Sequence, residues 1–205
     1  AADGSIWIGT PEGLILGEPI EEEPNQYRFT NLSKNSAYLN IGGQILPYDR
    51  KMMAVHAILP IEENYMLIGT QNGIFIYNTQ EKNFSAASVN TQITDKVNSI
   101  IRNHDGDIWA GTALGLYRMR WTGKQLMAKT IYDYKNPQWA MVGTDWVNIL
   151  INDHNGAIWA GTRGGGLIQI NSKGELTSYY SDLSNSRRIG DNMINALMID
   201  RTGVL

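Results

Sequence analysis

The segment from Tyr132 to Trp146 holds the side chains best suited to binding chemistry, because it carries four aromatic residues with Lys135, Asn136 and Gln138 between them. Aromatic faces stack on sugar rings, and amides and charged groups hydrogen-bond to sugar hydroxyls, so this composition suits a carbohydrate. The same aromatics could instead pack under an outer strand as part of the core, and both interpretations stay open. The candidate ligand-binding residues are Tyr132, Tyr134, Trp139, Trp146 and Arg163.

Arg163 belongs to the run Gly161-Thr162-Arg163-Gly164-Gly165-Gly166. Its glycine content is that of a phosphate-binding loop, but the Gly-Lys-Ser/Thr ending is missing and the run is expected to join two strands. We interpret it as a lengthened turn whose flexibility could aim Arg163 at an anionic sugar.

The chain offers little for catalysis. Glycosidases need two carboxylates about 5–10 Å apart, and Asp133 and Asp145 flank one loop, but turn capping is the role expected for both. The sequence has no Gly-x-Ser-x-Gly elbow and no cysteine. We therefore predict no catalytic residue and no enzymatic activity in this chain.

Metal and cofactor sites are not predicted either. None of the three histidines is spaced from another as metal ligands are, and His104 and His154 stand at equivalent places beside turns. The net charge of −3 and the scattered distribution of 17 basic residues argue against a nucleic-acid surface. No stretch has the length of a membrane span, so any membrane or targeting segment would lie outside this chain.

One five-residue motif recurs along the chain and predicts the fold. It joins apolar residues to Gly-Thr, and its copies are Ile6–Thr10, Met66–Thr70, Ile108–Thr112 and Ile158–Thr162. The motif glycines at 9, 69, 111 and 161 are separated by 60, 42 and 50 residues, a spacing typical of β-propeller blades. A second strand signal recurs at 55–58, 97–100, 147–150 and 194–197.

Turn signals join these two strands in three repeats, as Asp105-Gly106, Asn155-Gly156 and Thr202-Gly203. The glycines supply the positive φ that a two-residue hairpin turn requires. Since alternate side chains of a strand face opposite sides, Trp109 and Gly111 share one face, and the bare glycine lets the next blade pack closely. We place Trp109 and Trp159 in the core, and each such aromatic contributes about 2–3 kcal/mol when buried.

The predicted fold class is all-β, a β-propeller of four-stranded antiparallel blades. For the third repeat the expected strands are 96–102, 107–112, 115–120 and 127–133. We treat 1–205 as one propeller fragment of about four blades, cut from a larger array, with a closed four-blade ring as the alternative. Its Trp-strand motifs lie near 5–17, 65–77, 107–119 and 157–170, and a further repeat starts at 193–205.

Two stretches receive particular expectations. The polar stretch 18–50 is interpreted as an insertion in loop conformation, because it carries Glu21-Glu22-Glu23-Pro24 and an Asn-rich run. Residues 193–199 are expected to form a strand without its hairpin partner.

The repeat closely resembles that of the two-component-regulator propeller family. The resemblance is carried by Val97-Asn98-Ser99-Ile100, by 105–112 and by 115–118, with the second repeat departing at Glu63-Asn64 and Leu67. It implies the periplasmic sensor region of a bacterial hybrid two-component protein whose histidine kinase, membrane helix and DNA-binding parts lie outside this chain.

The function implied is non-catalytic sensing of oligosaccharides from polysaccharide breakdown, which would regulate the genes for their use. A protein–protein interaction scaffold is the first alternative, and a propeller glycosidase or lyase is the second. Because open blade faces would be exposed, we also expect the chain to self-associate.

Overall fold

The computed structural model describes residues 4–23, 25–35, 38–41, 44–47, 54–87, 93–123, 125–182 and 189–205. The chain forms two compact units, Ala1–Ser88 and Val89–Leu205. Both units consist of β-sheets in which most strands are antiparallel and follow one another along the chain, and in the first unit one pairing, between Asn40 and Ser85, is parallel. The all-β fold class and its propeller blades are as predicted.

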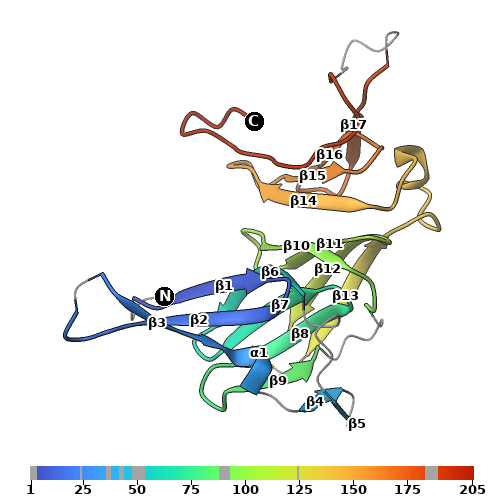
Figure 1. The fold of residues 1–205 in the computed structure, drawn as a ribbon. Helices are drawn as coiled ribbons and strands as arrows, with labels where there is room; N and C mark the ends of the chain where they lie inside the picture. Colours follow the sequence, from blue (N-terminus) through green and yellow to red (C-terminus); the bar gives the residue numbers. More distant parts are fainter. Residues whose placement is uncertain are drawn as a thin grey trace. The chain divides into compact units, whose positions relative to one another are not determined.

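Two four-stranded sheets make up the second unit, both in the strand order of the chain (Figure 1). The first contains β10 (Val97–Arg102), β11 (Ile108–Thr112), β12 (Gly115–Trp121) and β13 (Leu126–Tyr132). The second contains β14 (Val147–Asn152), β15 (Ile158–Thr162), β16 (Leu167–Ile170) and β17 (Leu176–Tyr179). The strands expected for the third repeat agree with β10 to β13 to within one residue at each end.

The two sheets of the second unit share one hydrophobic core. Trp109 from β11 and Ile158 and Ala160 from β15 are buried in it. The prediction that Trp109 is a core residue is therefore confirmed. Trp159 faces the opposite side of β15, because alternate side chains of a strand point in opposite directions. It is half-buried there, with its ring 5.6 Å from that of Tyr179.

The first unit contains a three-stranded and a six-stranded sheet. The three-stranded sheet contains β1 (Ile6–Thr10), β2 (Gly13–Pro19) and β3 (Tyr27–Asn31), followed by the short helix α1 (Leu32–Asn35). The six-stranded sheet has the order β5-β4-β9-β8-β7-β6. Its strands are β4 (Tyr38–Ile41), β5 (Gln44–Pro47), β6 (Val55–Glu62), β7 (Tyr65–Thr70), β8 (Gly73–Asn78) and β9 (Asn83–Ala86).

The loop expected over 18–50 is wrong for much of that stretch, since β3, α1, β4 and β5 lie within it. In β3 the aromatics Tyr27 and Phe29 alternate with polar residues, which is the two-residue repeat of side chains expected in a β-strand. Phe29 pairs with Gly17 of β2, where an added Cβ would come within 2.7 Å of its ring. The ring thus covers the bare glycine and stabilises the pair. Residues 24, 36–37, 42–43 and 48–50 of this stretch lie outside the described residues.

The motif glycine leaves a space, here called the socket, that a side chain of the following repeat fills. A Cβ added to Gly9 would lie 2.7 Å from the Val55 side chain, and one added to Gly111 would lie 2.6 Å from that of Val147. At Gly161 the nearest atom is in Ile194, again at 2.6 Å. The close approach expected from the sequence is confirmed in these three copies.

Asparagines tie consecutive blades together beside these sockets. The Asn98 side-chain amide donates to the carbonyl oxygen of Val147 at 2.8 Å, and Asn148 donates to that of Ile194 at 3.0 Å. Both bonds reach the start of the next repeat, which is β14 at Val147 and a segment without a strand at Ile194. The repeat therefore carries a glycine contact and an amide bond that act on the same neighbouring residue.

The turn between the first two strands of a blade is one residue longer than expected. In the third repeat the Gly106 N–H donates to the Asn103 carbonyl, and the Asn103 N–H donates to the Asp107 carbonyl. Gly106 has φ 80°, while no positive φ occurs at His104 or Asp105. This is a three-residue loop with a left-handed third residue, so one glycine suffices.

Residues 193–199 form no strand; their one ladder contact is the bridge between Arg163 and Met193. Ile194 N–H nevertheless donates to the Thr162 carbonyl at 2.9 Å. The turn at Asp200 repeats the hydrogen bonds of the turn at Asn103. The segment thus lies where the first strand of a further repeat would lie, but within the described residues no second strand pairs with it.

Helices are minor in the described part of the chain. They are the four residues of α1 and the three of the 3₁₀ helix η1 (Ala140–Val142), and no described helix could span a membrane. In the same residues, no three or more His, Asp or Glu side chains gather as a metal ion would require.

Candidate functional site

The loop between β13 and β14 buries two of the predicted ligand-binding residues. Tyr132 is 3% exposed and stacks on Trp109, with ring centroids 6.0 Å apart. Trp139 is 1% exposed, lies 6.0 Å from Tyr132, and donates its indole N–H to the Thr144 carbonyl at 3.1 Å. Both rings belong to the core between the two sheets. Their faces are covered by protein side chains.

Tyr134 lies on the outside of the same loop, 70% exposed. The Lys135 ammonium is 5.3 Å from its ring centroid. A shallow hollow of about 230 Å³ lies beside it and is lined by Tyr134, Trp139, Ala140, Gly143, Thr144 and Asp145. The loop therefore presents one exposed ring next to a small cavity.

Trp146 and Arg163 are brought together at the end of this loop. The Arg163 guanidinium lies 4.9 Å from the Trp146 ring centroid, and its backbone N–H donates to the Trp146 carbonyl at 2.9 Å. The glycine run forms the turn between β15 and β16, closed by the Thr162 N–H donating to Gly166. The expected strand-to-strand turn is confirmed, and Arg163 is held against an aromatic face.

The carboxylate of Asp133 caps a turn, as expected from the sequence. Its Oδ1 accepts a hydrogen bond from the Lys135 N–H at 2.9 Å. Asp133 and Asp145 also act on Tyr117: burial, followed by the negative charges of Asp95, Asp133 and Asp145, raises the pKa of that phenol. At neutral pH Tyr117 therefore stays protonated.

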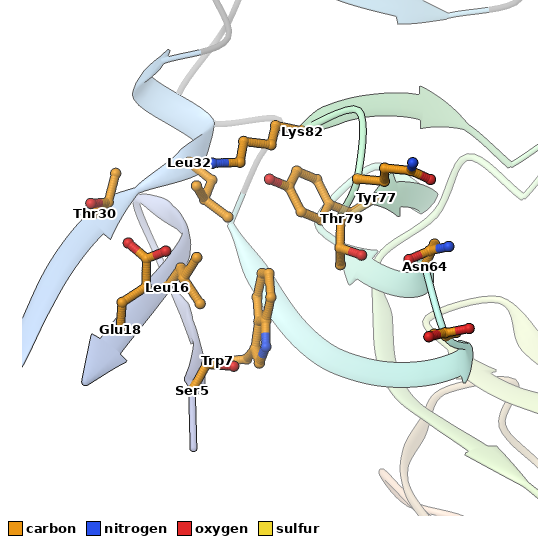
Figure 2. A pocket seen from close by; sticks show the side chains of 12 residues that line it. Ser5, Trp7, Leu16, Glu18, Thr30, Leu32, Asn64, Tyr77, Thr79 and Lys82 are labelled. Carbon is orange, nitrogen blue, oxygen red and sulfur yellow. The ribbon is translucent and has the colours of Figure 1, made fainter. Parts of the chain in front are cut away.

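A larger hollow, which the sequence analysis did not predict, lies in the first unit. Figure 2 shows this groove between the three-stranded sheet and the turns of the neighbouring sheet. Its volume is about 700 Å³. The lining residues are Ser5, Trp7, Leu16, Glu18, Thr30, Leu32, Glu63, Asn64, Tyr77, Thr79, Gln80 and Lys82.

Two aromatic residues form the floor of the groove. Trp7 on β1 meets Tyr77 on β8 edge to face, with centroids 5.7 Å apart and planes at 61°. Tyr77 is buried, whereas Trp7 is only half-buried. Burial and, secondarily, the charge of Glu18 raise the pKa of Tyr77. The phenol is therefore a neutral hydrogen-bonding group.

The opposite wall is a turn held by one asparagine. The Asn78 Oδ1 accepts from the backbone N–H groups of Gln80 (2.9 Å) and Glu81 (3.0 Å). Lys82 follows in the left-handed region at φ 54°. This arrangement fixes the backbone that carries Thr79, Gln80 and Lys82 into the groove (Figure 2). A cation on this wall thus faces a groove whose other wall carries Glu18.

Comparison with family models gives no match, and no curated protein matches the chain. Solved structures do match. The extracellular domain of a protein assigned as a hybrid two-component system of B. thetaiotaomicron is 15% identical, covering 97% of this chain and 23% of that chain, with a TM-score of 0.68.

Two other structures share the fold. PorZ, an essential surface component of the type-IX secretion system of Porphyromonas gingivalis, is 15% identical over 85% of this chain and 25% of its own, with a TM-score of 0.62. Virginiamycin B lyase of Staphylococcus aureus is 14% identical over 91% of this chain and 55% of its own, with a TM-score of 0.58. The chain spans about a quarter of the length of the first two structures. These similarities show a shared fold, which proteins of different function use.

Proposed function

We propose that this chain is a non-catalytic sensor module, located outside the cytoplasm, of a hybrid two-component signalling protein. Its ligand is an oligosaccharide released from a polysaccharide, and the histidine kinase lies in parts of the protein beyond this chain. The resemblance of the repeats to the two-component-regulator propeller family and the fold shared with the extracellular domain of a protein assigned as a hybrid two-component system support the signalling role. In this proposal binding regulates genes for using the polysaccharide.

The groove of Figure 2 carries the proposal of an oligosaccharide ligand. Its volume of about 700 Å³ is that of a site for a ligand of several rings. Half-buried Trp7 supplies an apolar surface on which a sugar ring can lie, and Thr30, Asn64 and Gln80 supply neutral hydrogen-bonding groups around it. Such a lining suits an uncharged, hydroxyl-rich ligand better than an apolar one.

The groove also suggests how binding could be sensed. One wall comes from β1, β2 and β3, and the other from β8 and the turns of the neighbouring sheet. A ligand that contacts both walls binds best at one spacing of the two sheets. It would therefore shift the blades toward that arrangement without any chemical step.

The test compares two tryptophans at the same motif position. The chain is titrated by calorimetry and thermal shift with neutral oligosaccharides prepared from plant and host polysaccharides. Trp7→Ala removes the exposed aromatic surface of the groove, whereas Trp159→Ala removes a half-buried ring that does not line it. We expect one oligosaccharide class to raise the melting temperature and Trp7→Ala alone to weaken its binding about tenfold or more.

Two results would refute the proposal. Equal loss of binding in both variants would mean that Trp7 acts through stability and that the groove is not the site. A stable chain that binds no oligosaccharide would favour the interaction scaffold instead.

A further inference from the structure

A second site of unusual charge lies on the sheet β10–β13, and none of its residues lines the groove. Three cationic side chains converge there on one carboxylate, that of Asp107, which is 0% exposed. Arg118 Nε donates to Oδ2 at 2.8 Å and Arg120 Nε to Oδ1 at 2.8 Å, while the Lys129 ammonium contacts both oxygens at 2.8 and 3.0 Å. One carboxylate thus serves three cations.

The third cation reaches the carboxylate through a β-bulge. In the pairing of β12 with β13, Arg118 lies opposite Thr130 and Met119 opposite Ala128, so Lys129 is an extra residue in its strand. A bulge re-aims a side chain that regular register would direct elsewhere. A bulge weakens the strand pairing locally. We therefore interpret this one as a feature that positions Lys129.

The cluster keeps an excess of positive charge at its surface. Three cations against one anion leave two uncompensated positive charges, and the side chains of Arg118, Arg120 and Lys129 are 27%, 51% and 37% exposed. Both guanidinium groups use their Nε–Nη2 side on Asp107. Within the described part of the chain neither Nη1 makes a hydrogen bond, so each guanidinium group keeps a second edge for another oxyanion.

The fold does not need this cluster. Serine and alanine stand at the Asp107 position in the first and fourth repeats, as Ser5 and Ala157. The two arginine positions hold Leu16 and Glu18 in the first repeat, and Gln169 and Asn171 in the fourth. Both repeats form their sheets with these residues. A buried carboxylate with surplus cations adds little net stability over residues that form no such ion pairs.

We propose that Arg118, Arg120 and Lys129 form a binding site for one oxyanion, with Asp107 holding the three side chains in position. The ligand group is a carboxylate or a sulfate, and we assign it to an acidic saccharide. The saccharide assignment rests on the proposed function, whereas oxyanion binding rests on the cluster alone.

The test uses the full chain and three probes: sodium glucuronate, sodium sulfate and glucose. Arginine Nε–H signals in ¹H–¹⁵N spectra report on the site, and ionic strength is held constant because screening weakens such contacts. Arg120→Gln with Lys129→Gln removes the surplus charge but leaves the Arg118–Asp107 pair. Lys173→Gln with Arg201→Gln makes the same charge change at exposed turn residues of the same unit.

We expect both anions to shift the Arg118 and Arg120 signals saturably and glucose to leave them unchanged. Arg120→Gln/Lys129→Gln should weaken anion binding about tenfold or more, and the Lys173/Arg201 control should bind as the parent chain does. No saturable shift with either anion, or equal binding in the two double variants, would overturn the oxyanion site. Sulfate binding without glucuronate binding would overturn a carboxylate as the ligand group and support a sulfate. Neutral oligosaccharide binding in the groove without anion binding here would refute this site and leave the proposed function standing.

Discussion

Replacing Gly111 by alanine tests the contact on which blade stacking depends. A Cβ at this position would lie 2.6 Å from Cγ1 and 3.1 Å from Cβ of Val147, both within the core between the two sheets. Ordinary van der Waals contact begins at about 3.4 Å, so the sheets must separate by roughly 1 Å or Val147 must leave its rotamer. Neither adjustment is local, because Val147 is fully buried.

The expected size of the effect follows from two opposing contributions. Overpacking a core of this density costs about 1–3 kcal/mol, and alanine lowers the entropy of the unfolded chain by about 0.4–1 kcal/mol relative to glycine. We therefore expect Gly111→Ala to lower the free energy of unfolding by about 1–2 kcal/mol. The measurement is a urea titration followed by tryptophan fluorescence.

Two further variants make the reasoning refutable. Gly190→Ala is the matched control, because a Cβ there meets no atom within 4 Å and the residue has no positive φ. In the double variant Gly111→Ala/Val147→Ala the removed methyl groups make room for the new one, so its destabilisation should be less than the sum of the two singles. Additive effects, or a Gly111→Ala chain as stable as the parent, would show that the socket does not determine blade spacing.

Three other predictions concern single contacts described above. Asp153→Asn takes away the carboxylate that accepts the Trp159 indole N–H at 3.0 Å, so urea titration should show a loss of about 1–3 kcal/mol, and an unchanged midpoint would contradict this. Burial raises the pKa of Asp107 but hydrogen bonds from Lys129, Arg120 and Arg118 outweigh it and hold that pKa below its usual range. The contribution of Asp107 to stability is thus complete above about pH 4 and is lost as the pH falls through the lowered pKa. Asp107→Asn should therefore flatten the acid limb of the curve of unfolding free energy against pH. Parallel curves for the variant and the parent chain would argue against this. Among the described residues β1 is an edge strand with exposed Ile6 and Ile8, so we propose that the chain self-associates through this edge. Sedimentation velocity should show a concentration-dependent dimer that Ile8→Lys abolishes. A monomer at every concentration would rule out this self-association.

The blades could be predicted from sequence because their signals are local. The apolar-Trp-apolar-Gly-Thr motif, the turn glycine and the following Gly-Leu pair all fall within about twelve residues, and β10 to β13 emerged where they were expected. The socket at Gly111 could also be inferred, since strand alternation places it beside Trp109. The polar edge strand β3 was missed because acidic and proline residues before it resemble a loop.

The groove and the cation cluster depend on register and on distant segments, which composition does not reveal. The groove joins β1, β2 and β3 with two turns of the next sheet, and the departure of Glu63-Asn64 from the repeat was its only sequence signal. Lys129 joins the cluster through a β-bulge that no local sequence pattern predicts. For the loop before β14, aromatic content alone did not distinguish buried Trp139 from exposed Tyr134.

The paired contacts at two blade boundaries have an evolutionary consequence. The glycine and the asparagine of one repeat act on the start of the next repeat, at Val147 and again at Ile194. A repeat such as the one that begins at Val147 thus contacts the repeat before it through that valine and the segment after it through Asn148 and Gly161. Duplication of a whole repeat of this kind would reproduce both contacts, so a gene of this design can change its blade number in a single step and leave side chains facing ligands to diverge afterwards.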